Sequence, residues 1–213
     1  TTNKLLAALV GDLFGLRVQA YPRYGSEKKG LPTAYFLTIA EGPIRTHAEL
    51  ERVDFVPLHD VAAFSQGAPL RGLVDEGTVF VQTPFTDPER IWASFPIRAR
   101  TEILQRRIRV FALDTVALAR AYAPRPELLV RMQGIALVGV FLRVAPFATR
   151  FGFDKERLMA AVQERLGRFF GKRGGAVVDA NMAVVRAAYD GVIDVTTVIG
   201  AVPIADQLEE VTR

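Results

Sequence analysis

Short apolar runs alternate with amphipathic helical segments along most of this chain, and this alternation limits the folds that it can adopt. The runs at residues 78–82 and 108–113 are largely apolar, which is typical of strands buried in a parallel sheet. Strands separated by helices predict an α/β fold with a mainly parallel sheet. The predicted strands cover residues 17–21, 34–39, 54–58, 78–82 and 108–113. The predicted helices cover residues 4–14, 60–64, 68–74, 87–93, 97–106, 126–142, 155–169 and about 175–189, with one more capped by Asp114 or Thr115.

The length and the periodicity together set the expected domain organisation. At about 150 residues per domain, 213 residues predict one large domain or one domain with an appendage. The helical and strand patterns continue to residue 191 and weaken after it. We therefore expect a domain at residues 1–191, helical in its C-terminal part, and a tail or linker at residues 192–213.

The composition excludes several kinds of site. The chain has no cysteine, so these residues carry no disulfide, no cysteine-bound zinc or iron–sulfur cluster and no thiol nucleophile. Its two histidines, His47 and His59, are too few for a multi-histidine metal centre, and each is expected to cap an element or lie at the surface. No HExxH, nucleophile elbow or Ser/His/Asp arrangement is present. We predict no catalytic residue and no metal ligand in this chain.

Charge and hydropathy argue against two kinds of partner. The net charge is +4, but no block of five like charges exists, and we expect no nucleic acid partner. The longest apolar run, residues 134–142, is less than half of the roughly twenty residues that a membrane span needs. The first residues have no signal-peptide pattern, so we expect a cytoplasmic protein without a membrane span.

The beginning of the first helix is one candidate binding site. Thr1, Thr2, Asn3 and Lys4 precede or open an apolar helix. Free N–H groups at a helix start favour an anion, and the hydroxyls and the lysine add donors, so a phosphate could bind here. The alternative is an ordinary helix cap, for which Thr and Asn are also suited.

Two further candidates follow predicted strands. The loop Tyr24-Gly25-Ser26-Glu27-Lys28-Lys29-Gly30 places Ser26, Lys28 and Lys29 between glycines that allow a ligand close to the backbone. Thr83 lies at the carboxyl end of the strand at residues 78–82, where open α/β sheets bind ligands. The alternatives are a solvated loop and a plain turn.

Polar residues also interrupt two apolar helices. Arg131-Met132-Gln133 and Asn181 are of this kind, and polar groups that become buried need hydrogen-bond partners. We expect these side chains to join a structural network rather than to contact a ligand.

Several segments, taken in order, resemble the gamma subunit or gamma domain of the 2-oxoacid:ferredoxin oxidoreductases, the pyruvate:ferredoxin oxidoreductase group. Thr2-Asn3-Lys4 is similar to the end of the family's glycine-rich opening. The loop at residues 24–30 is similar to the family's Tyr-[Asp/Gly]-Ser-x-Lys-x-Gly motif. The other similar segments are Pro43-Ile44-Arg45, Gln82-Thr83-Pro84-Phe85, Leu113-Asp114-Thr115 with Ala119, Arg131-Met132-Gln133, and Phe170-Gly171-Lys172-Arg173-Gly174 with Asn181.

This resemblance implies a fold and a function. It implies a Rossmann-like module of an enzyme that oxidatively decarboxylates a 2-oxoacid, such as pyruvate or 2-oxoglutarate, to acyl-CoA and CO2. Thiamine diphosphate, Mg and 4Fe–4S clusters would lie in partner alpha, beta and ferredoxin-like delta subunits or domains, and electrons would leave to ferredoxin or another acceptor. This module would help to hold coenzyme A. The phosphates of coenzyme A would face Thr2, Asn3, Lys4, Ser26 and Lys28. The expected cofactor-binding set also includes Thr1, Lys29 and Thr83.

Two other functions stay open at this point. The chain could be a free-standing module for NAD(P) or another nucleotide, although it has no complete G-x-G-x-x-G motif. It could also be an assembly scaffold without a ligand, in which Lys28 and Lys29 pair with acidic partners.

Overall fold

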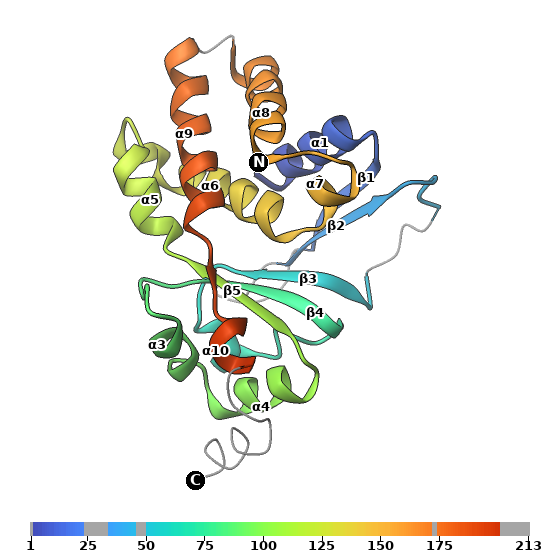
Figure 1. The fold of residues 1–213 in the computed structure, drawn as a ribbon, viewed down its shortest axis with the longest axis vertical. Helices are drawn as coiled ribbons and strands as arrows, with labels where there is room; N and C mark the ends of the chain where they lie inside the picture. Colours follow the sequence, from blue (N-terminus) through green and yellow to red (C-terminus); the bar gives the residue numbers. More distant parts are fainter. Residues whose placement is uncertain (1, 24–33, 46–49, 172–173, 201–213) are drawn as a thin grey trace. The chain divides into compact units, whose positions relative to one another are not determined.

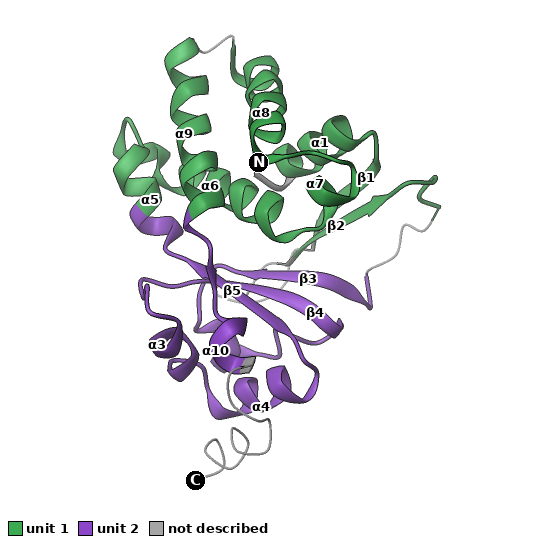
Figure 2. Cartoon of the chain, viewed as in Figure 1, with its two compact units in different colours: residues 1–49, 118–190 green, residues 50–117, 191–213 purple. Residues whose placement is uncertain are grey.

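The computed structural model describes residues 2–23, 34–45, 50–171 and 174–200 (Figure 1). The chain divides into two compact units, each made of two stretches of sequence (Figure 2). Unit 1 comprises residues 1–49 and 118–190, and unit 2 comprises residues 50–117 and 191–213. No helix within the described ranges is long and apolar enough to cross a membrane.

Unit 2 is built on a four-stranded sheet. Strands β3, β4 and β5 are parallel, in that order, and β6 is antiparallel to β5. Val79, Phe80 and Val81 of β4 are completely buried, as their apolar run predicts for a central strand. The elements are β3 (Val53–Leu58), α2 (Ala63–Gln66), β4 (Leu73–Gln82), α3 (Pro88–Ala93), α4 (Ile97–Gln105), β5 (Arg109–Leu113), β6 (Ile193–Asp194) and α10 (Thr196–Gly200).

One predicted helix of unit 2 is wrong. Residues 69–72 form turns rather than a helix, and β4 already begins at Leu73. Leu70 and Leu73 have the spacing of a helix face, but Gly72 has a φ of +84°, which only glycine adopts without strain. The Gly72 carbonyl accepts a hydrogen bond from the N–H of Val53 at 2.8 Å, which brings the start of β3 beside this turn. Long-range strand pairing therefore overrides the local helical pattern.

The C-terminal segment of unit 2 packs against β5. Thr196 Oγ1 accepts a hydrogen bond from the Val110 N–H at 2.8 Å, and Val195 and Ile199 are buried in the same core as β4 and β5. These residues belong to the segment expected as a tail or linker. Residues 201–213 lie outside the described part of the chain, and the domain boundary expected after residue 191 stays a prediction.

Unit 1 is mainly helical. Its two strands, β1 and β2, pair antiparallel with an unbroken register from Arg17↔Ala40 to Arg23↔Ala34, and they form a sheet of their own. Helix α6 is the most buried element, with eleven of its sixteen residues buried. The elements are α1 (Thr2–Phe14), β1 (Arg17–Arg23), β2 (Ala34–Ala40), most of α5 (Thr115–Tyr122), a 3-10 turn (Pro126–Leu128), α6 (Leu129–Val144), α7 (Phe147–Arg150), α8 (Lys155–Phe170) and α9 (Gly175–Gly191).

Helix α1 is held by its apolar face. Leu5, Leu6, Leu9 and Val10 are buried, and α1 packs against β1, β2, α6 and α8. At its C-terminal end the ring of Phe14 stacks on those of Phe147 and Phe151 and meets that of Phe153 edge-on, at centroid distances of 5.4–5.7 Å. The predicted α/β class, with a mainly parallel sheet, flanking helices and a helical C-terminal part, is confirmed.

Candidate functional site

The N-terminus of α1 is the first candidate site, and unit 1 contains it. The helix begins at Thr2, two residues before the start of the predicted helix at residues 4–14, and its first turn has no acidic residue. Lys4 lies in this turn and is exposed. Because the first N–H groups of a helix have no partner within the helix, this end presents donors and a positive partial charge. The arrangement suits an anion such as a phosphate group.

The carboxyl edge of the sheet in unit 2 is the second candidate. Strands β3, β4 and β5 are parallel, so their carboxyl ends lie at one edge. Gln82 Oε1 accepts hydrogen bonds from the Thr115 N–H at 2.6 Å and from Thr115 Oγ1 at 2.5 Å. Gln82 Nε2 donates to Asp114 Oδ1 at 3.3 Å, and the same oxygen accepts from the Ala117 N–H at 2.9 Å. The edge is therefore a connected polar network at the start of α5.

Thr83 follows Gln82 at this edge. It is 1% exposed, and its Oγ1 accepts a hydrogen bond from the Phe85 N–H at 3.3 Å. The Thr83 N–H in turn reaches the Leu113 carbonyl at 3.4 Å. The side chain thus holds the turn after β4.

His59 follows β3 directly. Desolvation lowers the pKa of the His59 imidazole below its ordinary value, although the residue keeps contact with solvent. The ring is therefore neutral at pH 7. Its surface position agrees with the sequence, whereas His47 lies outside the described residues.

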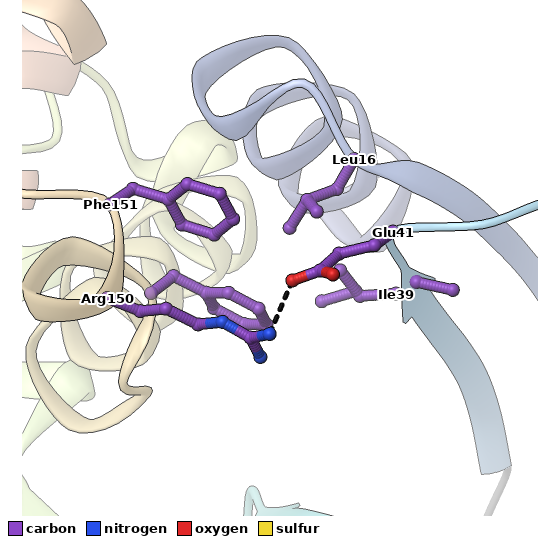
Figure 3. A pocket seen from close by; sticks show the side chains of 7 residues that line it. Leu16, Ile39, Glu41, Arg150 and Phe151 are labelled. Atoms are coloured by element: carbon purple, nitrogen blue, oxygen red, sulfur yellow. Dashed lines mark hydrogen bonds and ion pairs between the residues drawn. The ribbon is translucent and has the colours of Figure 1, made fainter.

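A small pocket in unit 1 is the third candidate, and no sequence pattern pointed to it. Its floor is apolar, and an ion pair between Glu41 and Arg150 crosses its mouth (Figure 3). The volume is about 50 Å³. Pockets for small organic ligands are typically about 300 Å³ or larger, so this one accommodates water rather than a nucleotide. The lining residues are Leu16, Ile39, Ala40, Glu41, Phe147, Arg150 and Phe151.

The structure describes only part of the predicted cofactor-binding set. Lys4 is exposed in unit 1 and Thr83 is buried in unit 2. Thr2 and Asn3 form the start of α1 by their backbone. Thr1, Ser26, Lys28 and Lys29 lie outside the described residues. The role of the set in binding stays a prediction.

The polar residues expected to be structural can also be placed. Asn181 is 4% exposed in α9, and its Nδ2 donates to the Val177 carbonyl one turn earlier at 2.7 Å. Met132 is buried in α6, Gln133 is half-buried and Arg131 is exposed. Arg131 is therefore a surface residue and not part of an internal network.

Comparison with solved structures identifies the fold. The crystal structure of pyruvate oxidoreductase subunit PORC from Thermotoga maritima matches with a TM-score of 0.63 and 22% identity, over 90% of this chain and 88% of that one. A keto/oxoacid ferredoxin oxidoreductase gamma subunit from Geobacter sulfurreducens matches with a TM-score of 0.54 and 14% identity, over 89% of this chain and 88% of that one.

Sequence comparison identifies the family. A pyruvate-flavodoxin oxidoreductase from Trichormus variabilis is 23% identical over a match that covers 92% of this chain and 16% of the relative. A pyruvate dehydrogenase [NADP(+)] from Cryptosporidium parvum is 23% identical over 92% of this chain and 10% of the relative. The chain thus spans a sixth or less of these relatives. Residues 1–191 match the model of the pyruvate ferredoxin/flavodoxin oxidoreductase family, to which this chain belongs.

Proposed function

We propose that this chain is the gamma-type domain of an iron–sulfur and thiamine diphosphate dependent 2-oxoacid oxidoreductase. Such an enzyme converts a 2-oxoacid, such as pyruvate or 2-oxoglutarate, and CoA to acyl-CoA and CO2, and it passes two electrons to ferredoxin or another acceptor. The observation that carries the proposal is the family match over residues 1–191. The agreement of the fold with PORC from Thermotoga maritima supports it.

The composition of this chain supports redox chemistry in another part of the proposed enzyme. Iron–sulfur clusters are held mainly by cysteine thiolates, and the 213 residues contain no cysteine. We therefore assign the 4Fe–4S clusters to a ferredoxin-like delta subunit or another partner, and thiamine diphosphate with its Mg ion to the alpha and beta subunits or domains. This chain then has a binding and assembly role rather than a catalytic one, in a complex that we expect in the cytoplasm.

Coenzyme A is the ligand that we propose for this domain. Its phosphate groups are anionic, and the N-terminus of α1 offers unpaired N–H donors, an exposed Lys4 and no acidic residue in the first turn. When bound, CoA supplies the thiol that receives the acyl group. Thr2, Asn3 and Lys4 at the helix start would face its phosphates, and the family resemblance adds Ser26 and Lys28. The predicted cofactor-binding set also includes Thr1, Lys29 and Thr83, of which Thr83 is buried and holds the turn after β4.

Purification of the tagged chain from its native host without oxygen tests the assembly. Mass spectrometry should recover cluster-binding and thiamine-binding chains or domains with it. Recovery of a monodisperse chain alone would overturn the proposal, and NAD(P) binding would then support a free-standing nucleotide module.

Steady-state kinetics of the purified complex test the CoA site. Lys28→Ala should raise the KM for CoA about tenfold or more, because a charge-assisted phosphate contact contributes roughly 1.5–3 kcal/mol, and should leave the KM for the 2-oxoacid unchanged. Lys155→Ala is the matched control, since Lys155 Nζ pairs with Asp190 at 2.6 Å. If Lys28→Glu with Lys29→Glu breaks the assembly at unchanged CoA affinity, these lysines serve a scaffold instead.

A further inference from the structure

The turn between α5 and α6 carries an unusual concentration of exposed apolar side chains. We call residues 120–131 the α5–α6 corner; it lies within unit 1, at the left of the view in Figure 1. Four large hydrophobic side chains are exposed among the described residues, and two of them, Tyr122 and Val130, belong to this corner. Val130 is 80% exposed, whereas α6 is mostly buried from Met132 onward. Exposed apolar side chains that form a contiguous patch mark an interaction site, whereas single ones need no explanation, so the two in this short segment make it the candidate that we test.

Three exposed arginines belong to the same corner as these apolar side chains. Arg120, Arg125 and Arg131 are all exposed, and Glu127 is the one acidic residue of the corner. Glu127 lies 3.4 Å from Arg125 Nε. Within the described part of the chain, none of the ion pairs involves Arg120 or Arg131. The corner therefore combines exposed apolar side chains with a net positive charge.

This combination fits a protein surface better than a polyanion. Tyrosine and arginine are among the residue types enriched in the energetic centres of protein interfaces. An exposed valine gains free energy only when another apolar surface covers it. A nucleic acid backbone would use the arginines but would leave Val130 in water. A complementary partner has an apolar surface bordered by Asp and Glu, because that border neutralises the arginines and steers the encounter.

We propose that the α5–α6 corner docks onto an acid-bordered apolar surface of another subunit or domain of the oxidoreductase. This partner rests on the proposed function. The match to the pyruvate-flavodoxin oxidoreductase from Trichormus variabilis spans 16% of that protein, so most of such an enzyme lies outside the matched region and can supply the covering surface.

The absence of cysteine makes a direct test possible. Val130→Cys introduces the single thiol of this chain, on an exposed helical position that tolerates the change. Maleimide labelling of this thiol, located by peptide mass mapping, should be fast in the isolated chain and about tenfold or more slower in the purified complex. Gln163→Cys, at an exposed position of α8, is the matched control and should react at the same rate in both.

The outcomes separate this proposal from the proposed function. A complex that forms but leaves the thiol of the Val130→Cys variant as reactive as in the isolated chain overturns the docking surface alone. The thiol could instead be protected already in the isolated chain and lose that protection on dilution. This result would assign the corner to a second copy of this chain and would also overturn the docking surface. Recovery of the chain without partners overturns the proposed function, and this partner with it.

Charge reversal tests the acidic border. Arg120→Glu with Arg131→Glu should weaken the complex about tenfold or more and lower the salt concentration at which it dissociates. Arg168→Glu with Arg186→Glu, two exposed positions of α8 and α9, should not weaken it.

A photo-crosslinker on the thiol of the Val130→Cys variant should attach to peptides rich in Asp or Glu. Crosslinks to RNA, or equal effects of the two charge reversals, contradict the proposal.

Discussion

Gly139 of α6 lies directly against the backbone of α9 in unit 1. A Cβ at this position would lie 2.3 Å from the Val185 carbonyl oxygen and 2.9 Å from the Ala188 Cβ. Both contacts are too short, and the first is to backbone that cannot move alone. Gly139→Ala should therefore lower the free energy of unfolding by about 1–3 kcal/mol, measured by chemical denaturation.

Gly167 provides the control for this substitution. It lies within α8 with nothing within 4 Å of the Cβ that an alanine would add. Gly167→Ala should raise the free energy of unfolding, by up to about 1 kcal/mol, because alanine has the higher helix propensity. Equal effects at the two positions would contradict the close packing of α6 on α9.

Gln82 ties the end of β4 to the start of α5 by hydrogen bonds. Its Oε1 is the acceptor for both the N–H and the hydroxyl of Thr115, which is 3% exposed. Gln82→Met keeps the size but leaves these donors unpaired, and it should cost about 1–3 kcal/mol in thermal or chemical unfolding. Gln163→Met, on the surface of α8, should change the stability by less than about 0.5 kcal/mol. A stability loss at Gln82 as small as that of the control would show that water replaces the side chain.

At the scale of the elements, the strands differ in how well pairing and burial shield their amides from solvent. Strand β4 pairs on both sides and its central residues Val79 and Val81 are completely buried. Strands β1 and β2 pair only with each other among the described residues, and the side chains of residues 35–40 are all half-buried. Two-stranded sheets are marginally stable. In the isolated chain, amides of β2 should exchange with deuterium about tenfold or more faster than those of β4. Equal protection would mean that the hairpin is held more firmly than its pairing indicates.

The same elements show which parts of the fold could be predicted. Strands β4 and β5 were recognisable because a strand buried on both faces is a continuous apolar run. Strand β6 has two residues, too few for any periodicity, and it exists through its pairing of Ile193 with Ala112. The separation of β1 and β2 from the main sheet was not predictable either, because strand patterns carry no information on which strands pair.

For the candidate sites too, local features were predictable from the sequence and long-range contacts were not. The start of α1 and the position of Thr83 after a strand are local features, and the sequence predicts both. The link between Gln82 and Asp114 depends on the register that aligns Gln82 with Leu113, so it appears only in the folded sheet. The ion pair between Glu41 and Arg150 joins residues 109 positions apart, and no motif marks it.

At the scale of the whole molecule, the composition bears on where the redox centres of the proposed enzyme lie. Each unit has a core of its own, built from aliphatic and aromatic side chains, and among the described residues neither core contains a disulfide or a cluster of metal ligands. The proposed enzyme needs clusters to carry electrons, and clusters need thiolates. Under the proposed function, the redox centres therefore belong to other subunits or domains, and this chain has the binding role proposed above.

This division predicts the outcome of an iron–sulfur reconstitution. The isolated chain, incubated with ferrous iron and sulfide without oxygen and then desalted, should retain no stoichiometric iron and show no visible cluster absorption, because it has no cysteine ligand. The complex purified from the host should contain both iron and acid-labile sulfide in fixed ratio to the chain. Iron and sulfide retained in equal amounts by the isolated chain would require non-cysteine ligands and would move electron transfer into this domain. Iron missing from an intact complex would instead contradict the proposed redox activity while leaving the family and the fold in place.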